Sequence, residues 1–80
     1  MPSKKLIEEV WEKGKPIRGL NEDVWRRDSE GNKVRRGSFG TVGEYGWEID
    51  HIRPKEKGGS DNIRNLQPLQ WEENREKSDK

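Results

Sequence analysis

The 80-residue sequence contains no cysteine and no alanine. Without cysteine the chain can form neither a disulfide nor a thiolate zinc site, and nothing in it points to an oxidising compartment. The missing alanine and the dense Glu and Lys pattern of residues 4–9 fit either a redesigned surface or an unusual natural composition. Fold and function must therefore be inferred from other residue types.

Apolar residues are also few, since 25% of the chain is hydrophobic and 41% is charged. So low an apolar content would by itself place the chain near the disordered class. The apolar residues are large, however, and include four tryptophans. Burying a large apolar side chain yields about 1.5–3 kcal/mol, so a thin core is feasible. The length suits a single domain over residues 1–80.

Long hydrophobic runs are missing as well. No stretch approaches the roughly 20 apolar residues that a membrane helix needs, and residues 1–10 are too polar for a signal peptide. We therefore expect a cytoplasmic protein without a membrane partner, monomeric by default. The net charge is only +1, whereas many nucleic-acid binders have a clear excess of basic residues. The partner must therefore be inferred from where the basic residues lie along the chain.

The first part of the chain predicts a helix followed by a hairpin. Apolar residues at positions 6, 7, 10 and 11 share one face of a helix over 4–13, with Ser3 as N-cap and Gly14 as its stop. A connector completes residues 1–22. The runs 24–28 and 33–36 flank Glu30-Gly31-Asn32, which predicts a β-hairpin. Four glycines in residues 37–46 indicate an irregular loop, which ends the segment 23–46.

The segment 47–80 predicts strand, loop, strand and helix. Trp47 and Ile49 alternate with polar neighbours, which predicts a strand up to about Ile52 that Pro54 ends. Residues 54–62 are polar and predict a loop, and residues 65–69 a return strand. Residues 71–78 contain no Gly or Pro and predict a short helix. The expected fold class is α+β.

This last segment carries a distinctive residue pattern. Asp50-His51-Ile52-Arg53-Pro54 is followed by Gly58-Gly59, by Asn65-Leu66, and then by Asn74 and Lys77. The pattern resembles the HNH endonuclease signature over residues 47–77, with Asn74 where other members have His. The resemblance implies a small ββα-metal (HNH) core, preceded here by an N-terminal helix and an additional β-hairpin.

The resemblance also implies an activity, namely hydrolysis of nucleic-acid phosphodiester bonds with one divalent cation. His51 would be the general base, because an imidazole exchanges protons near neutral pH. Asn65 would hold the loop and the imidazole in orientation. Asp50 and Asn74 would hold the cation, and such oxygen ligands favour Mg²⁺ or Mn²⁺ over zinc.

A second metal is not expected. Many family members carry a C-x-x-C zinc knuckle, whose second pair falls where this chain has Gln70 and Glu73. With no cysteine in the chain, the resemblance implies an HNH domain without structural zinc.

Basic residues of the hairpin and of the HNH pattern offer contacts to a phosphate backbone. The expected partner is nucleic acid, with DNA favoured over RNA and bound with little sequence specificity, although the sequence itself does not distinguish the two. The residues expected to contact it are Arg26, Arg35, Arg53, Arg75 and Lys77.

Each of these residues also has an ordinary interpretation. Asp50 would pair with an arginine, Asn65 and Asn74 would be turn and surface residues, and the basic side chains would form a solvated face. The chain would then be a nucleic-acid-binding or scaffold module with an HNH fold and weak or no catalysis, natural or engineered. A domain excised from a larger nuclease also fits the sequence.

Overall fold

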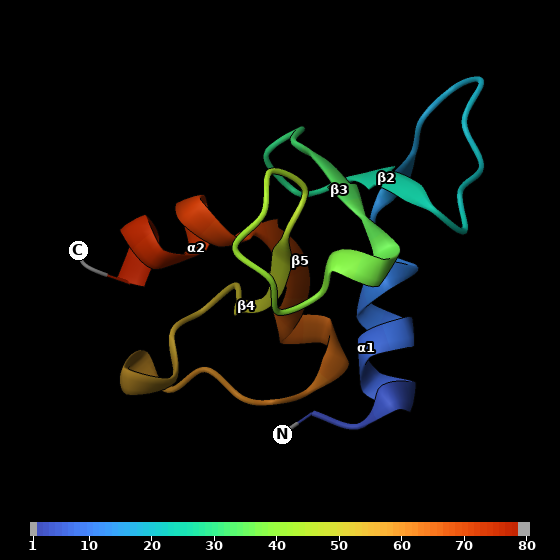
Figure 1. Ribbon diagram of the computed structural model, residues 1–80. Coiled ribbons are helices and arrows are strands. Elements are labelled where there is room, and N and C mark those ends of the chain that lie inside the picture. The colour runs from blue at the N-terminus through green and yellow to red at the C-terminus, as the bar shows by residue number, and fades with distance from the viewer. Residues whose placement is uncertain (1, 79–80) are drawn as a thin grey trace.

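The structure is a computed structural model that describes residues 2–78. In that range it has two helices and two small antiparallel sheets (Figure 1). The helices are α1 (Lys4–Trp11) and α2 (Trp71–Ser78). The first sheet has the order β1 (Lys15–Pro16), β2 (Trp25–Arg27), β3 (Lys33–Arg35), and the second pairs β4 (Trp47–His51) with β5 (Leu66–Gln70). The predicted α+β class is confirmed.

The β4–β5 pair lies between the two helices, with α1 on one side and α2 on the other (Figure 1). The long connection from β4 to β5 carries two single 3₁₀ turns, η2 (Lys55–Lys57) and η3 (Ile63–Asn65). The three-stranded sheet lies at the other end of the molecule from this connection. Neither helix of the described range has the length and apolar character that crossing a bilayer requires.

Helix α1 begins as its sequence predicts and ends earlier. The Ser3 hydroxyl accepts a hydrogen bond from the Leu6 amide at 3.1 Å, so the predicted N-cap is confirmed. The amides of Lys13 and Gly14 bond to carbonyls three residues back, at 3.0 and 2.9 Å. This 3₁₀-type bonding tightens the chain after Trp11, which is why the helix stops two residues before the predicted end.

The core is built around two tryptophans. The rings of Trp11 and Trp47 lie 5.5 Å apart and are tilted by 43°, and Phe39 meets Trp47 edge-on at 4.9 Å. Val10, Val34 and Leu66 complete the buried cluster. The indole nitrogen of Trp11 donates to the Glu22 carbonyl and that of Trp47 to the Arg36 carbonyl, at 3.2 and 3.3 Å. Their polar atoms are therefore satisfied within the core.

Asp28 ties the predicted hairpin to the start of α2. Only 3% of this residue is exposed, and its carboxylate accepts from the backbone amides of Glu30, Asn32 and Gln70 at 2.9, 2.7 and 2.8 Å. The Asn32 side chain also donates to Glu73. The positions of the second zinc-knuckle pair, Gln70 and Glu73, are thus connected to the hairpin turn by hydrogen bonds.

The structure adds a short strand where the sequence predicted a connector. Lys15 and Pro16 of β1 pair with Arg27 and Arg26 of β2. A two-residue strand has no periodicity that a sequence could reveal. The remaining predictions for the first part hold, because the hairpin forms and residues 37–46 are irregular apart from the single turn η1 (Arg36–Ser38).

Arg26 differs from its expected place on a phosphate-binding surface. The residue is 8% exposed, and its guanidinium donates to the backbone carbonyls of Glu22, Glu12 and Gly14 at 2.9, 3.0 and 3.2 Å. It also lies 5.7 Å from the ring centre of Trp11. These contacts use Arg26 inside the fold, where it connects α1 to β2, and we leave it out of the nucleic-acid surface.

Candidate active site

Asp50, near the end of β4, accepts hydrogen bonds from β5 and from α2. The residue is 6% exposed and stands directly opposite Gln67 of β5. Its Oδ2 accepts from Gln67 Nε2 at 2.8 Å and from Lys77 Nζ of α2 at 2.7 Å. The Lys77 ammonium donates to the His51 carbonyl as well, at 3.2 Å. A carboxylate fixed in this way keeps one orientation.

His51 is the last residue of β4, and its ring meets a carboxylate from the following loop. His51 Nε2 lies 2.7 Å from Asp61 Oδ1, and Lys55 Nζ lies 3.3 Å from Asp61 Oδ2. Hydrogen bonds from His51 and then from Lys55 hold the pKa of the Asp61 carboxyl below its usual value. Asp61 is therefore charged at neutral pH and orients the imidazole. Sequence reasoning missed this residue, because the contact depends on the path of the loop.

Asn65 fastens the two ends of that loop together. Its side-chain oxygen accepts from the Arg53 amide at 2.8 Å, and its amide group donates to the carbonyls of Arg53 and Ser60 at 3.1 and 2.8 Å. Gly59 permits the close approach, because a Cβ there would lie 1.8 Å from the Arg53 carbonyl oxygen. The hydrogen bonds of Asn65 thus hold the loop, and through it Asp61, while the imidazole itself is contacted by Asp61.

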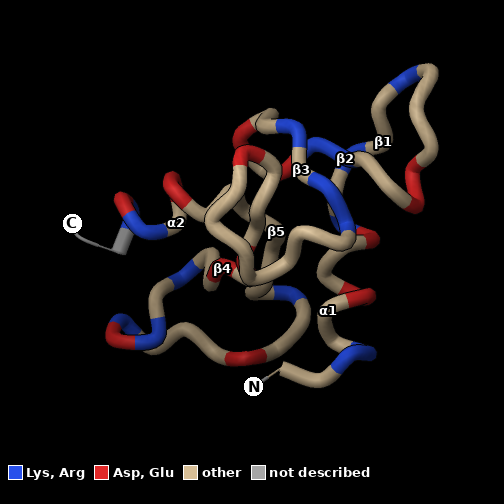
Figure 2. Tube along the Cα trace, viewed as in Figure 1, with Lys and Arg blue, Asp and Glu red and all other residues tan. Residues whose placement is uncertain are grey.

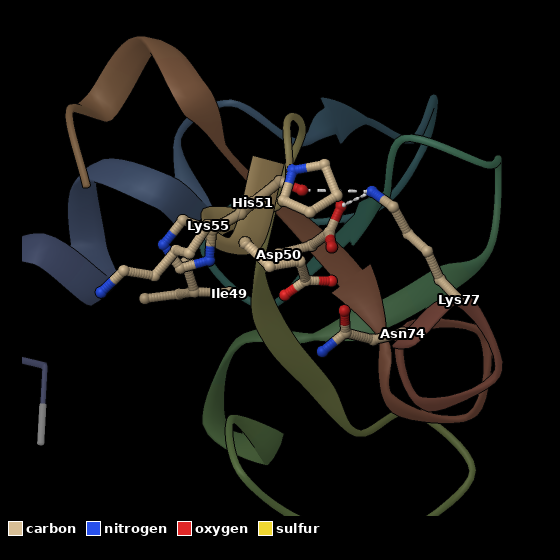
Figure 3. Close-up of a pocket in the computed structure, with 8 residues that line it drawn as sticks. Ile49, Asp50, His51, Lys55, Asn74 and Lys77 are labelled. Carbon is tan, nitrogen blue, oxygen red and sulfur yellow. Dashed lines mark hydrogen bonds and ion pairs between the residues drawn. The ribbon is translucent and has the colours of Figure 1, made fainter. Parts of the chain in front are cut away.

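Asn74 faces Asp50 from helix α2. Its amide nitrogen donates to Glu48 Oε1 at 3.0 Å, and its amide oxygen points into the hollow that Asp50 also lines (Figure 3). Glu48 also accepts from Arg75 at 3.1 Å. Glu48 therefore fixes which end of the Asn74 amide is presented to this hollow, which is a second positioning role that the spacing of the sequence did not reveal.

Asp50, His51 and Asn74 meet at one hollow of about 300 Å³ (Figure 3). Its walls are these three residues, Lys77, Ile49 and the loop residues Pro54, Lys55 and Glu56. Asn65, which was expected to meet Asp50, His51 and Asn74, does not line it. In the described part of the chain, histidine, cysteine and carboxylate side chains form no cluster of three that would suit a metal ion. The oxygen pair of Asp50 and Asn74 fits a hard cation that keeps several water ligands.

The expected phosphate contacts fall into two groups. Lys77 lines the hollow, and Arg53 is exposed in the adjoining loop. Arg75 follows the lining residue Asn74 on α2 and lies 5.2 Å from the Trp71 ring centre. Arg35 is exposed on β3, at the opposite end of the molecule from the β4–β5 loop (Figure 2). A nucleic-acid strand bound at the hollow would therefore lie near Arg53, Arg75 and Lys77. Arg35 would lie far from it.

The HNH endonuclease family model matches residues 34–80, which is more than half of the chain. The chain belongs to the HNH endonuclease family. The matched range contains β4, β5, α2 and every wall residue of the 300 Å³ hollow. A search of curated proteins and a search of solved structures each found no match. In this HNH domain α1, β1 and β2 lie outside the matched range, and α1 covers the face of β5 away from α2.

Proposed function

We propose that this HNH domain is a metal-dependent endonuclease that hydrolyses phosphodiester bonds of nucleic acid, DNA above all, with little sequence specificity, and that it acts in the cytoplasm. The observation that carries the proposal is the meeting of Asp50, His51 and Asn74 at one hollow beside Lys77. A base, two oxygen ligands and a cationic side chain are the groups that phosphodiester hydrolysis uses.

His51 would take the proton from the attacking water. The water oxygen would form a bond to phosphorus while the bond from phosphorus to the leaving oxygen breaks. The leaving oxygen would then take a proton from solvent water, and His51 would release its proton to solvent. Asp61 holds the imidazole at Nε2, as the carboxylate of a hydrolytic triad does for its histidine. Asn65 contributes by holding the loop that carries Asp61.

Asp50 and Asn74 would hold the divalent cation, Mg²⁺ or Mn²⁺, which when bound neutralises charge on the phosphate and on the leaving oxygen. Lys77, Arg75 and Arg53 would bind the neighbouring phosphates, and such contacts carry no sequence information. The proposed low sequence specificity rests on these backbone contacts.

One observation favours the second candidate, a nucleic-acid-binding or scaffold module with weak or no catalysis. Asp50 Oδ2 is already occupied by Lys77 and Gln67, so the ammonium has to leave before a cation can use that oxygen. A module that never loads a metal would keep this ion pair permanently.

Supercoiled plasmid incubated with the protein and either Mg²⁺, Mn²⁺ or chelator distinguishes the two candidates. We expect nicking that rises through the millimolar range of Mg²⁺ or Mn²⁺ and stops in chelator. His51→Ala removes the base and leaves the cation ligands in place, so nicking should fall by at least about 10²–10⁴-fold while Mn²⁺ binding is kept.

Two further variants complete this test. Asp50→Ala should lose both Mn²⁺ binding and nicking, because Asn74 alone offers one neutral oxygen. Asn65→Ala should be intermediate, because base and ligands remain but the loop that orients them is loosened. If His51→Ala nicks plasmid as fast as the parent, the nuclease assignment fails, because the chain has no second histidine.

A further inference from the structure

A second, larger hollow of about 720 Å³ adjoins the reaction hollow. Its volume lies within the roughly 300–1,000 Å³ of small-molecule sites in proteins. Leu6 of α1, Phe39 and Leu66 give it apolar walls, and all three also pack against the core. These three side chains belong to or pack on the core, so one wall of the hollow is fixed by the fold, while Pro2, Gly40, Lys55 and Asp61 form other parts of it.

The two hollows share part of their walls. Ile49, His51, Lys55 and Asn74 line both of them. A phosphate placed at His51 in the first hollow therefore has the second hollow directly beside it. Every phosphate of a nucleic-acid strand is flanked by nucleosides, so one neighbouring nucleoside of the cleaved bond comes to the mouth of the second hollow.

The polar groups of the second hollow suit a neutral, flat ligand better than another phosphate. Its two carboxylates, Glu48 and Asp61, are each paired, Glu48 with Arg75 and Asp61 with Lys55 and His51. Carboxylate oxygens repel a phosphate but accept hydrogen bonds from the amino groups of nucleobases. The ring of Phe39 supplies the apolar contact that bases make with aromatic side chains.

We propose that the second hollow binds the base of an unpaired nucleotide next to the cleaved phosphate. The inference rests on the proposed nuclease function and specifies its substrate class. A base inside a duplex is stacked and paired and has to leave the helix to enter a pocket. The preferred substrate is therefore single-stranded nucleic acid, or a duplex with an unpaired nucleotide at the cleavage position.

The test compares three end-labelled DNA oligonucleotides of one sequence: a single strand, a perfect duplex, and a duplex with one bulged nucleotide. With Mg²⁺ we expect the single strand and the bulged duplex to be cleaved at least tenfold faster than the perfect duplex. In chelator, where cleavage stops, fluorescence anisotropy should show the same order of affinities.

Phe39→Leu removes the ring and keeps an apolar side chain against Trp47. It should lower the preference for the bulged over the perfect duplex by about tenfold, the size of one base–aromatic stacking contact. Tyr45→Leu is the matched control, since Tyr45 is a half-buried aromatic that does not line the hollow, and it should leave the preference unchanged. Thermal melts establish that both variants are folded.

The outcomes separate the two proposals. Equal cleavage and binding of all three oligonucleotides, with Phe39→Leu behaving as the parent, overturns the base pocket and leaves the nuclease assignment standing. Selective binding of the unpaired substrates that Phe39→Leu abolishes, without cleavage in any metal, supports the pocket and overturns the nuclease assignment. Absence of both binding and cleavage overturns both.

Discussion

Lys77 holds an oxygen of Asp50, the carboxylate that we propose as a ligand of the divalent cation. The ammonium lies 2.7 Å from Asp50 Oδ2, in a position where only 7% of the Asp50 side chain is exposed. Two cations close to one carboxylate repel each other, so the Lys77 ammonium should weaken the binding of a divalent ion to Asp50. In the proposed mechanism Lys77 would move from Asp50 toward a substrate phosphate in the hollow that it lines.

Replacing Lys77 by Met should therefore raise the affinity for Mn²⁺ measured by isothermal titration calorimetry. Loss of an ion pair worth ~1 kcal/mol corresponds to about a fivefold gain. Arg75→Met is the control, because Arg75 pairs with Glu48 and not with Asp50, and its Mn²⁺ affinity should stay near that of the parent. Weaker Mn²⁺ binding by Lys77→Met would show that the ammonium assists the site.

For single residues, the sequence predicts the members of the HNH signature but not the side chains that form hydrogen bonds with them. Asp50, His51 and Asn74 were expected at one site because they match the HNH signature, and the expected order of strand, loop, strand and helix allows them to come together. Asp61 and Glu48 reach them through contacts set by the loop path and by the rotation of α2. The burial of Arg26 could not be predicted either, because it depends on the position of the end of α1 relative to β2.

Elements with a strong pattern were predicted closely. Helix α2 has the predicted bounds, and α1, the hairpin and strands β4 and β5 agree with prediction to within a few residues. The sequence pattern did not predict the hydrogen bonds that join one element to another. Asp28 has no apolar neighbourhood or motif that marks it, yet its carboxylate joins the hairpin turn to β5.

Asp28→Ala should destabilise the fold by about 3 kcal/mol, because it leaves buried amides without their charged acceptor. Urea unfolding followed by tryptophan fluorescence measures the change. Asp23→Ala is the control, since Asp23 is exposed in the connector before β2, and it should stay within roughly 0.5 kcal/mol of the parent. Equal midpoints for both variants would mean that the hairpin is not tied to α2 through this carboxylate.

For the molecule as a whole, the question is what replaces the zinc knuckle of other family members. Hydrogen bonds of Asp28 and Asn32 hold the positions that a second cysteine pair would occupy, and the chain has no cysteine that could bind a structural zinc. The fold should then be independent of metal. Chelator should leave the far-ultraviolet circular dichroism spectrum and the melting temperature unchanged, and a cooperative loss of structure on chelation would contradict this.

The tryptophan pair of the core has a further, optical consequence. Trp11 and Trp47 come from α1 and β4, and their rings are 5.5 Å apart and inclined at 43°. Indoles this close and tilted share their excited states, so the pair should produce an exciton band of its own in the ultraviolet. That band exists only while the N-terminal helix is docked on the HNH segment, so its intensity reports their association without any added label.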